Sequence, residues 1–155
     1  MAIRSITPFL WFNSQAEEAA NYYLPLFPDS RISQVSRYGD AGPGPKGSAM
    51  VVAFELAGQR LLAMNGGPNF KLDEAFSLLV DCREQADIDL LWEKLGDGGA
   101  YNMCGWLKDR FGLCWQINYG GLPELLQGPN GSKVMQAMMG MKKIDIAALK
   151  SAAGA

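Results

Sequence analysis

Few side chains in this sequence could carry out acid–base or metal chemistry, because the chain contains no histidine. Histidine is the usual general base near neutral pH and the commonest ligand of transition metals. Serine and cysteine remain as nucleophiles, and a cysteine needs a neighbour that lowers its pKa. Cys104 and Cys114 lie near Lys108 and Arg110 in sequence. A turn that carries Lys-Asp-Arg is more typical of a solvated surface, so a catalytic thiol is the less favoured interpretation.

The remaining cysteine and carboxylate patterns point to no particular chemistry. Cys82, Cys104 and Cys114 are odd in number and include no Cys-x-x-Cys pair, so we expect free thiols in a reducing cytoplasm. Asp109 and Glu55 could pair as carboxylates, but nothing in the sequence fixes their separation. The sequence therefore predicts no glycosidase-type site.

The elements that must position these residues repeat along the chain. Residues 104–118 read as a β-hairpin, in which Asp109 to Gly112 forms the turn and Gly112 takes the positive φ of the bend. Residues 51–65 show the same pattern around Gly58, 54 residues earlier. Such self-similarity indicates an internal duplication.

The repeat extends upstream of both hairpins. A strand is predicted at 7–12 and a helix at 15–26; the second half has a strand at 75–80 and a helix at 83–95. Each half is thus predicted as β-α-β-β-β, with residues 65–68 as a breaker or linker between them. Phe12, Phe76, Leu78 and Val80 are expected in the core beneath the helices.

Bulk properties favour a single globular domain over 1–155, with module 1 at about 5–66, module 2 at about 74–119 and a helical tail at about 122–152. A net charge of −2 argues against nucleic acid as a partner, since phosphate binding needs clustered Lys and Arg. No run approaches the ~20 apolar residues of a membrane helix, and no secretory signal is evident. We expect a cytoplasmic protein.

The tail is predicted to contain short helices at 122–126, 134–141 and 144–149. Four methionines cluster in it, at positions 135, 138, 139 and 141. A flexible apolar face that fills gaps in the core or in a dimer interface is the favoured interpretation. A Met-lined ligand portal is the alternative.

Several motifs together resemble those of one family: Ile6-Thr-Pro-Phe-Leu-Trp-Phe12, Leu62-Ala-Met-Asn-Gly-Gly-Pro68, Cys104-Gly-Trp-Leu-Lys-Asp-Arg-Phe-Gly112, and residues 26–30, 38–39, 42–45, 134–138 and 142–149. The chain resembles the PhnB-like family of the vicinal oxygen chelate superfamily, often labelled 3-demethylubiquinone-9 3-methyltransferase-like. The resemblance implies an α+β fold in which two βαβββ modules form a curved, barrel-like mixed sheet with helices outside, plus the helical tail.

The methyltransferase label does not agree with the residues. A Rossmann-like methyltransferase needs a glycine-rich loop between the first strand and its helix. Residues 12–17 contain no glycine, and Gly42-Pro-Gly-Pro45 lacks a row of backbone N–H groups because proline has none. A methyltransferase site of that type is excluded.

The resemblance also implies four metal-ligand positions, usually His and Glu, on the first and last strands of the modules. By strand phase they fall near Thr7, Leu62, Ala75 and Gln116. Leucine and alanine have no donor atom, and threonine and glutamine are weak neutral donors. We therefore expect no metal and no cofactor, and we do not expect metal-dependent glyoxalase or dioxygenase chemistry.

Strand alternation then predicts a ligand pocket that is apolar and aromatic with a few polar groups. Its residues are expected to be Thr7, Phe9, Trp11, Leu62, Met64, Ser77, Leu79, Trp106, Cys114 and Gln116. The alternative is that these side chains fill the interior and leave no cavity.

Three hypotheses follow for function. The first is a metal-free protein that binds a small apolar or aromatic molecule. The second is a metal-independent isomerase, lyase or transferase that uses Cys114, Gln116 or a carboxylate. The third is a dimer with vestigial pockets. Proteins of the superfamily often dimerise so that modules from two chains pair, and the tail of this chain offers apolar surface. We therefore predict a two-fold homodimer.

Overall fold

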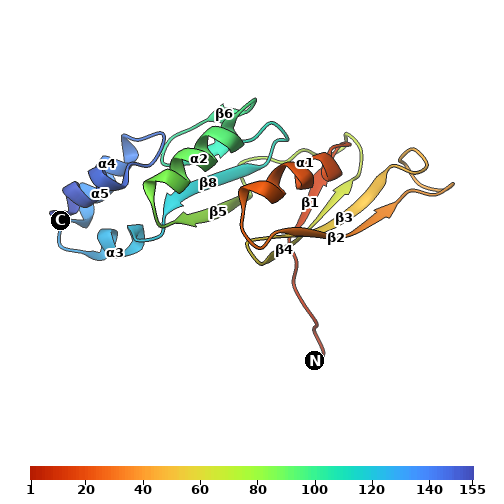
Figure 1. Ribbon diagram of the computed structural model, residues 1–155, viewed down its shortest axis with the longest axis horizontal. Helices are drawn as coiled ribbons and strands as arrows, with labels where there is room; N and C mark the ends of the chain where they lie inside the picture. Colours follow the sequence, from red (N-terminus) through yellow and green to blue (C-terminus); the bar gives the residue numbers. More distant parts are fainter. The chain divides into compact units, whose positions relative to one another are not determined.

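The computed structural model describes residues 1–155. The chain forms two compact units, residues 1–72 and residues 73–155. Each unit contains one four-stranded sheet with a helix on one face, and the second unit also contains the helical tail (Figure 1). The prediction of an α+β fold with two βαβββ modules is therefore confirmed, and neither sheet closes into a barrel by itself. No helix is both long enough and apolar enough to span a bilayer.

The first unit contains one α-helix, one 3-10 helix and four strands. In chain order these are β1 (Phe9–Phe12), α1 (Ala16–Tyr23), η1 (Leu24–Leu26), β2 (Arg31–Arg37), β3 (Ala49–Leu56) and β4 (Gln59–Asn65). The strands lie in the order β1-β4-β3-β2, with β1 parallel to β4 and the other pairs antiparallel. The β3–β4 turn has Ala57 at φ 47° and Gly58 at φ 80°, which confirms the predicted bend at Gly58.

One face of this sheet is closed by α1. Leu10 and Phe12 of β1 alternate toward the helix and are buried, as are Val52 and Phe54 of β3. The small residues of α1 at 16, 19 and 20, together with Tyr23, are fully buried and let the helix approach the sheet closely. The residues that alternate with these, such as Phe9 and Trp11 of β1, point to the opposite face of the sheet, which α1 does not cover.

The second unit repeats this arrangement with β5 (Ser77–Cys82), α2 (Gln85–Gly96), β6 (Ala100–Tyr101), β7 (Trp106–Lys108) and β8 (Cys114–Tyr119). The strand order is β5-β8-β7-β6, and β5 is parallel to β8. Ile88 and Leu95 of α2 pack over Trp115 and Ile117 of β8, and all four are essentially inaccessible to solvent. Gly112 has φ 93°, which confirms the second predicted bend.

The tail forms α3 (Leu122–Gln127), α4 (Gly131–Met139) and α5 (Ile146–Ala153). It is joined to the second unit by backbone bonds from Cys104 N to Met141 O and from Gly105 N to Lys142 O, both 2.8 Å. The Gln85 side chain donates to Ile144 O and accepts from Ile146 N, each at 2.9 Å. The tail is therefore an integral part of this unit.

Several predicted boundaries were wrong by one to three residues. β1 begins at Phe9 and β5 at Ser77, so Thr7 and Ala75 precede their strands. The predicted helix over 15–26 ends its α-helical part at Tyr23, because Pro25 follows and the chain continues as a 3-10 turn.

Two further corrections come from the second unit. The predicted hairpin over 104–118 begins its β7 strand at Trp106, because Cys104 and Gly105 have positive φ and donate their N–H groups to the tail, although Gly105 O still accepts from Ile117 N of β8 at 2.7 Å. Phe76 was predicted in the core, but it lies outside β5 and is 39% exposed.

Candidate functional site

The open face of the first sheet brings four predicted pocket residues together. Phe9 of β1 is paired with Leu62 of β4, and Trp11 with Met64. Paired residues point to the same side of a sheet, and this side is opposite to α1. Phe9 is 50% exposed, and the other three side chains are half-buried. The face is therefore apolar, sulfur-containing and aromatic.

Trp11 is held in place by the segment that follows β4. Its Nε1–H donates to Gly67 O at 2.9 Å, and its ring contacts Phe70 edge to face at 5.0 Å between centroids. A Cβ on Gly66 would overlap the indole, so glycine is needed there. Because the indole N–H is already used, Trp11 can offer a ligand its ring surface but no hydrogen bond.

The open face of the second sheet is more polar. Ser77 is paired with Cys114, and Leu79 and Trp106 are both paired with Gln116, so the five residues share one side. Leu79 is 57% exposed, and Gln116 Nε2 donates to Ser77 Oγ at 2.9 Å. The half-buried Gln116 amide is thus oriented by Ser77, with its oxygen left to accept a hydrogen bond.

Cys114 differs from its neighbours because it is only 2% exposed. It borders a cavity of about 100 Å³ together with Trp106, Lys108 and Glu74. Burial raises the pKa of the Cys114 thiol, and Lys108 opposes that effect only in part. Lys108 Nζ is also paired with Glu74 Oε1 at 2.6 Å. The thiol is thus protonated at neutral pH, which does not favour a nucleophile.

The residues at the four metal-ligand positions do not fit a divalent cation. Leu62 offers carbon only, Gln116 is bonded to Ser77, and Thr7 and Ala75 lie outside the strands. Across residues 1–155, no group of three or more His, Cys, Asp or Glu side chains is arranged to hold a metal ion.

Asp109 was expected in a solvated turn and is instead buried, with 3% of its surface exposed. Its Oδ1 accepts from Phe111 N at 2.8 Å and Leu113 N at 3.0 Å, and its Oδ2 accepts from Trp115 Nε1 at 2.8 Å. The sequence did contain a signal for this role: an Asp at the first position of a four-residue turn, whose carboxylate can accept hydrogen bonds from backbone N–H groups later in the turn. Its role is to fix the β7–β8 turn.

A cavity in the first unit was missed altogether. It has a volume of about 320 Å³ and is lined by Asn13, Ser14, Tyr38, Pro43, Gly44, Pro45, Ser48 and residues 65–68. Residues 65–68 were predicted as a linker between the halves. Asn65 is instead the last residue of β4, and the following three residues lie within the first unit.

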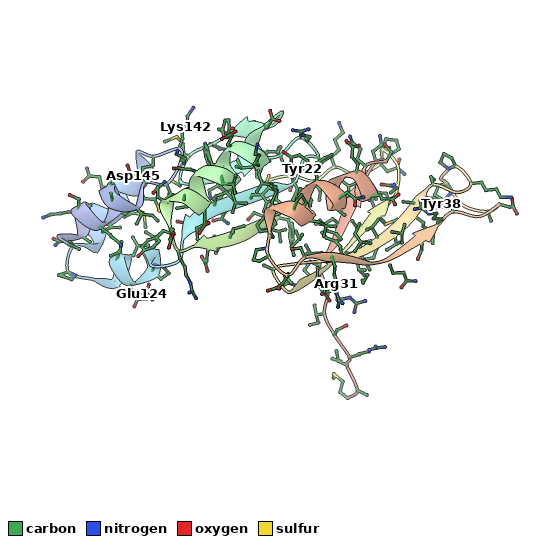
Figure 2. The ribbon with its side chains drawn as sticks, viewed as in Figure 1. Tyr22, Arg31, Tyr38, Glu124, Lys142 and Asp145 are labelled. Carbon is green, nitrogen blue, oxygen red and sulfur yellow. The ribbon has the colours of Figure 1, made fainter.

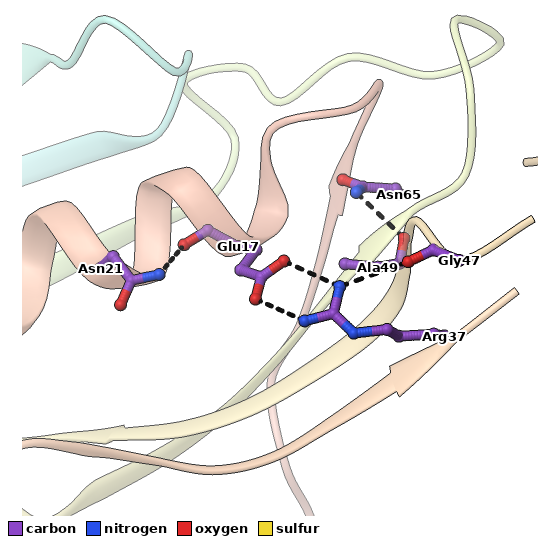
Figure 3. Close-up of polar contacts among 6 residues, drawn as sticks. All are labelled: Glu17, Asn21, Arg37, Gly47, Ala49 and Asn65. Atoms are coloured by element: carbon purple, nitrogen blue, oxygen red, sulfur yellow. Dashed lines mark hydrogen bonds and ion pairs between the residues drawn. The ribbon is translucent and has the colours of Figure 1, made fainter. Parts of the chain in front are cut away.

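Asn65 organises this end of the first unit, as Figure 3 shows in part. Its Oδ1 accepts from Ala16 N at 2.8 Å at the start of α1, and its Nδ2 donates to Ala49 O at 3.1 Å at the start of β3. Nearby, Arg37 donates twice to the Glu17 carboxylate, at 2.9 and 3.2 Å. This hydrogen bonding raises the pKa of the Arg37 guanidinium. These bonds tie the helix α1 and the three strands β2, β3 and β4 together.

The sequence and structure of this chain are similar to those of one protein family. The family model described as 3-demethylubiquinone-9 3-methyltransferase matches residues 4–118. A PhnB protein from Bacillus cereus is 37% identical, with a TM-score of 0.70, and the match covers 75% of this chain and 99% of that one. Curated proteins gave no match.

Two more distant structures show the fold alone. Protein PA1353 from Pseudomonas aeruginosa is 22% identical, with a TM-score of 0.63, over 76% of this chain and 98% of that one. The fosfomycin resistance protein FosX from Mesorhizobium loti is 16% identical, with a TM-score of 0.55, over 82% of this chain and 99% of that one. The family model and the Bacillus cereus structure together show that the chain belongs to the PhnB-like family described as 3-demethylubiquinone-9 3-methyltransferase.

Proposed function

We propose that this protein binds a small apolar or aromatic molecule, without a bound metal ion, on the open faces of its sheets. The observation that carries the proposal is the contrast between the two faces of each sheet. The helix-covered faces carry most of the fully buried side chains, such as Leu10 and Trp115, whereas the opposite faces leave Phe9 and Leu79 about half exposed. In the first sheet Phe9 adjoins the half-buried side chains Trp11, Leu62 and Met64, and a contiguous apolar patch marks a binding surface more often than scattered apolar residues do.

The polar groups on these faces favour specific binding of one ligand over non-specific adsorption of apolar molecules. Gln116 is oriented by its bond to Ser77, so its amide oxygen is held in position for a ligand donor. Trp11 is oriented by Gly67 and Phe70, so its ring is a preformed wall. Apolar walls with a few fixed polar groups are typical of small-molecule sites.

The metal-free part of the proposal rests on the donor set. The chain has no histidine, and the four positions that resemble the superfamily's ligand positions carry Thr7, Leu62, Ala75 and Gln116. These side chains provide no charged oxygen or nitrogen ligand. The family description mentions methyl transfer, but the loop between β1 and α1 contains no glycine, so a Rossmann-type cofactor site is not part of the proposal.

Gln116→Ala tests the proposal. A thermal-shift screen of aromatic and quinone-type molecules first supplies a ligand. Loss of the amide should then weaken that ligand about tenfold or more, because an unpaired buried polar group costs about 1–3 kcal/mol. The fold should survive, since Ser77 is half-buried and can bond to water.

Gln127→Ala is the matched control, because Gln127 is exposed at the end of α3 in the same unit. It should leave affinity unchanged. If no member of the screen raises the melting temperature, or if the two variants bind equally well, the proposed function is wrong.

A further inference from the structure

We propose that the cavity of the first unit is a second binding site, separate from the open sheet faces, for a small neutral molecule with a flat ring. The cavity lies beyond the carboxyl ends of the parallel strands β1 and β4, whose last paired residues are Phe12 and Asn65. Crevices outside the carboxyl ends of parallel strands are where open sheets commonly bind ligands. Its volume of about 320 Å³ is at the lower end of the range for small-molecule sites.

The walls of the cavity are fixed before any ligand arrives. Tyr38 lies at the end of β2 (Figure 2), and its hydroxyl donates to Asn65 O at 2.6 Å. The Tyr38 ring is held between Gly42 and Gly44, where any Cβ would collide with it. The loop that follows β2 is therefore locked against β4, and a preformed site loses less entropy on binding.

The lining carries no charge. None of its residues has an acidic or basic group apart from the Tyr38 phenol, which is already bonded. Charged residues of the neighbouring segments are paired with each other: Glu17 of α1 with Arg37 of β2, and Lys46, next to Pro45 in the chain, with Asp40. An ion entering this cavity would lose hydration without gaining a counter-charge, so the ligand should be neutral.

Several backbone positions of the cavity have no N–H group available to an anion. Gly66 N and Gly67 N already donate to Phe12 O at 2.9 Å and Asn13 O at 3.2 Å. Pro43, Pro45 and Pro68 have no N–H at all. The proline rings and the tyrosine ring form an apolar wall, with the exposed side chains of Asn13 and Ser14 at its edge. Such a wall suits a flat ring that carries one hydrogen-bonding group.

Comparison of the two repeated modules shows that only the first has an uncharged, proline-walled cavity at this end of its sheet. Gly120 N donates to Cys82 O at 2.9 Å, as Gly66 N does to Phe12 O, so the second sheet ends in the same way. The hollow there, however, is lined by Asp81 and Arg83. The same backbone thus forms a charged hollow in one module and an uncharged, proline-walled cavity in the other.

Phenol tests this inference, with amide chemical shifts as the readout. Phenol should shift the backbone amides of Ser14, Gly44 and Gly66 in a saturable way. Benzoate, which has the same ring with a negative charge, should bind at least tenfold more weakly. Ser14→Phe should abolish the phenol shifts by filling the cavity, because Ser14 is exposed and lines it.

Ser151→Phe makes the same change at an exposed serine of α5 and should leave phenol binding intact. The wild-type map alone can overturn the inference, whatever the variants do. Shifts centred on Leu62, Met64 or Gln116 would place the ring on the sheet faces of the proposed function. Absent or non-saturable shifts at the cavity, or equal binding of benzoate, would show that the cavity is no such site.

Discussion

Asp109→Asn should destabilise the second unit although it changes only one atom of the side chain. In the native protein Oδ1 accepts two backbone N–H bonds and Oδ2 accepts one from the Trp115 indole. Asparagine can keep the first two bonds with its carbonyl oxygen. Its amide nitrogen then faces the Trp115 N–H, so two donors meet in a site that is 3% exposed.

The size of the effect follows from that mismatch. A buried donor without an acceptor costs about 1–3 kcal/mol. If the asparagine amide were flipped, its NH2 group would face the two backbone N–H groups of Phe111 and Leu113, which is a worse arrangement. We expect Asp109→Asn to lower the free energy of unfolding by about 2 kcal/mol. Asp109→Ala should lose more, since all three bonds disappear and bonds to charged groups contribute about 1.5–3 kcal/mol each without adding fully.

Denaturant unfolding followed by circular dichroism measures the loss. Asp97→Asn is the matched control in the same region: Asp97 pairs with Arg110 at 2.6 Å, but its side chain is 70% exposed, and such pairs contribute at most about 1 kcal/mol. In a Trp115→Phe background, Asp109→Asn should cost less than in the wild type, because the opposing N–H is gone. Equal losses for Asp109→Asn and Asp97→Asn would refute this account of the turn.

Two further predictions concern the thiols and the assembly. Burial raises the pKa of Cys82 to about 11, which leaves about a hundredfold less thiolate than at its ordinary value, whereas Cys104 is partly exposed. An aromatic disulfide reagent at pH 8 should therefore label Cys104 first, and Cys104→Ser should remove the fast phase; faster labelling of Cys82 would contradict this. The exposed apolar side chains Phe9, Leu79 and Met139 favour a two-fold homodimer. Light scattering at micromolar concentration should give twice the chain mass, and a monomer would exclude it.

The parts of the fold that were predictable are those set by local rules. Gly58 and Gly112 mark the two hairpins because their bends require positive φ. The alternation of Leu10 and Phe12 with Phe9 and Trp11 separates the two faces of a strand. These local signals, repeated twice, were sufficient to define the two modules.

The parts that were missed depend on contacts between distant segments. The N–H groups of Cys104 and Gly105 turn away from the hairpin because the tail, more than 30 residues later, supplies Met141 O and Lys142 O as acceptors. Asp109 is buried because Trp115 folds over the same turn. The cavity is assembled from four separate stretches of the first unit, and no single stretch signals it.

The central claim, that a small molecule binds without a metal ion, is tested most directly by calorimetric titration of the ligand into untreated and chelator-treated protein. A ligand from the thermal-shift screen would be titrated into the protein before and after exhaustive treatment with a chelator. The account predicts the same affinity and the same stoichiometry in both titrations, because no side chain at the four superfamily ligand positions can hold a divalent cation. Binding that disappears after chelation and returns on addition of a divalent metal would contradict it.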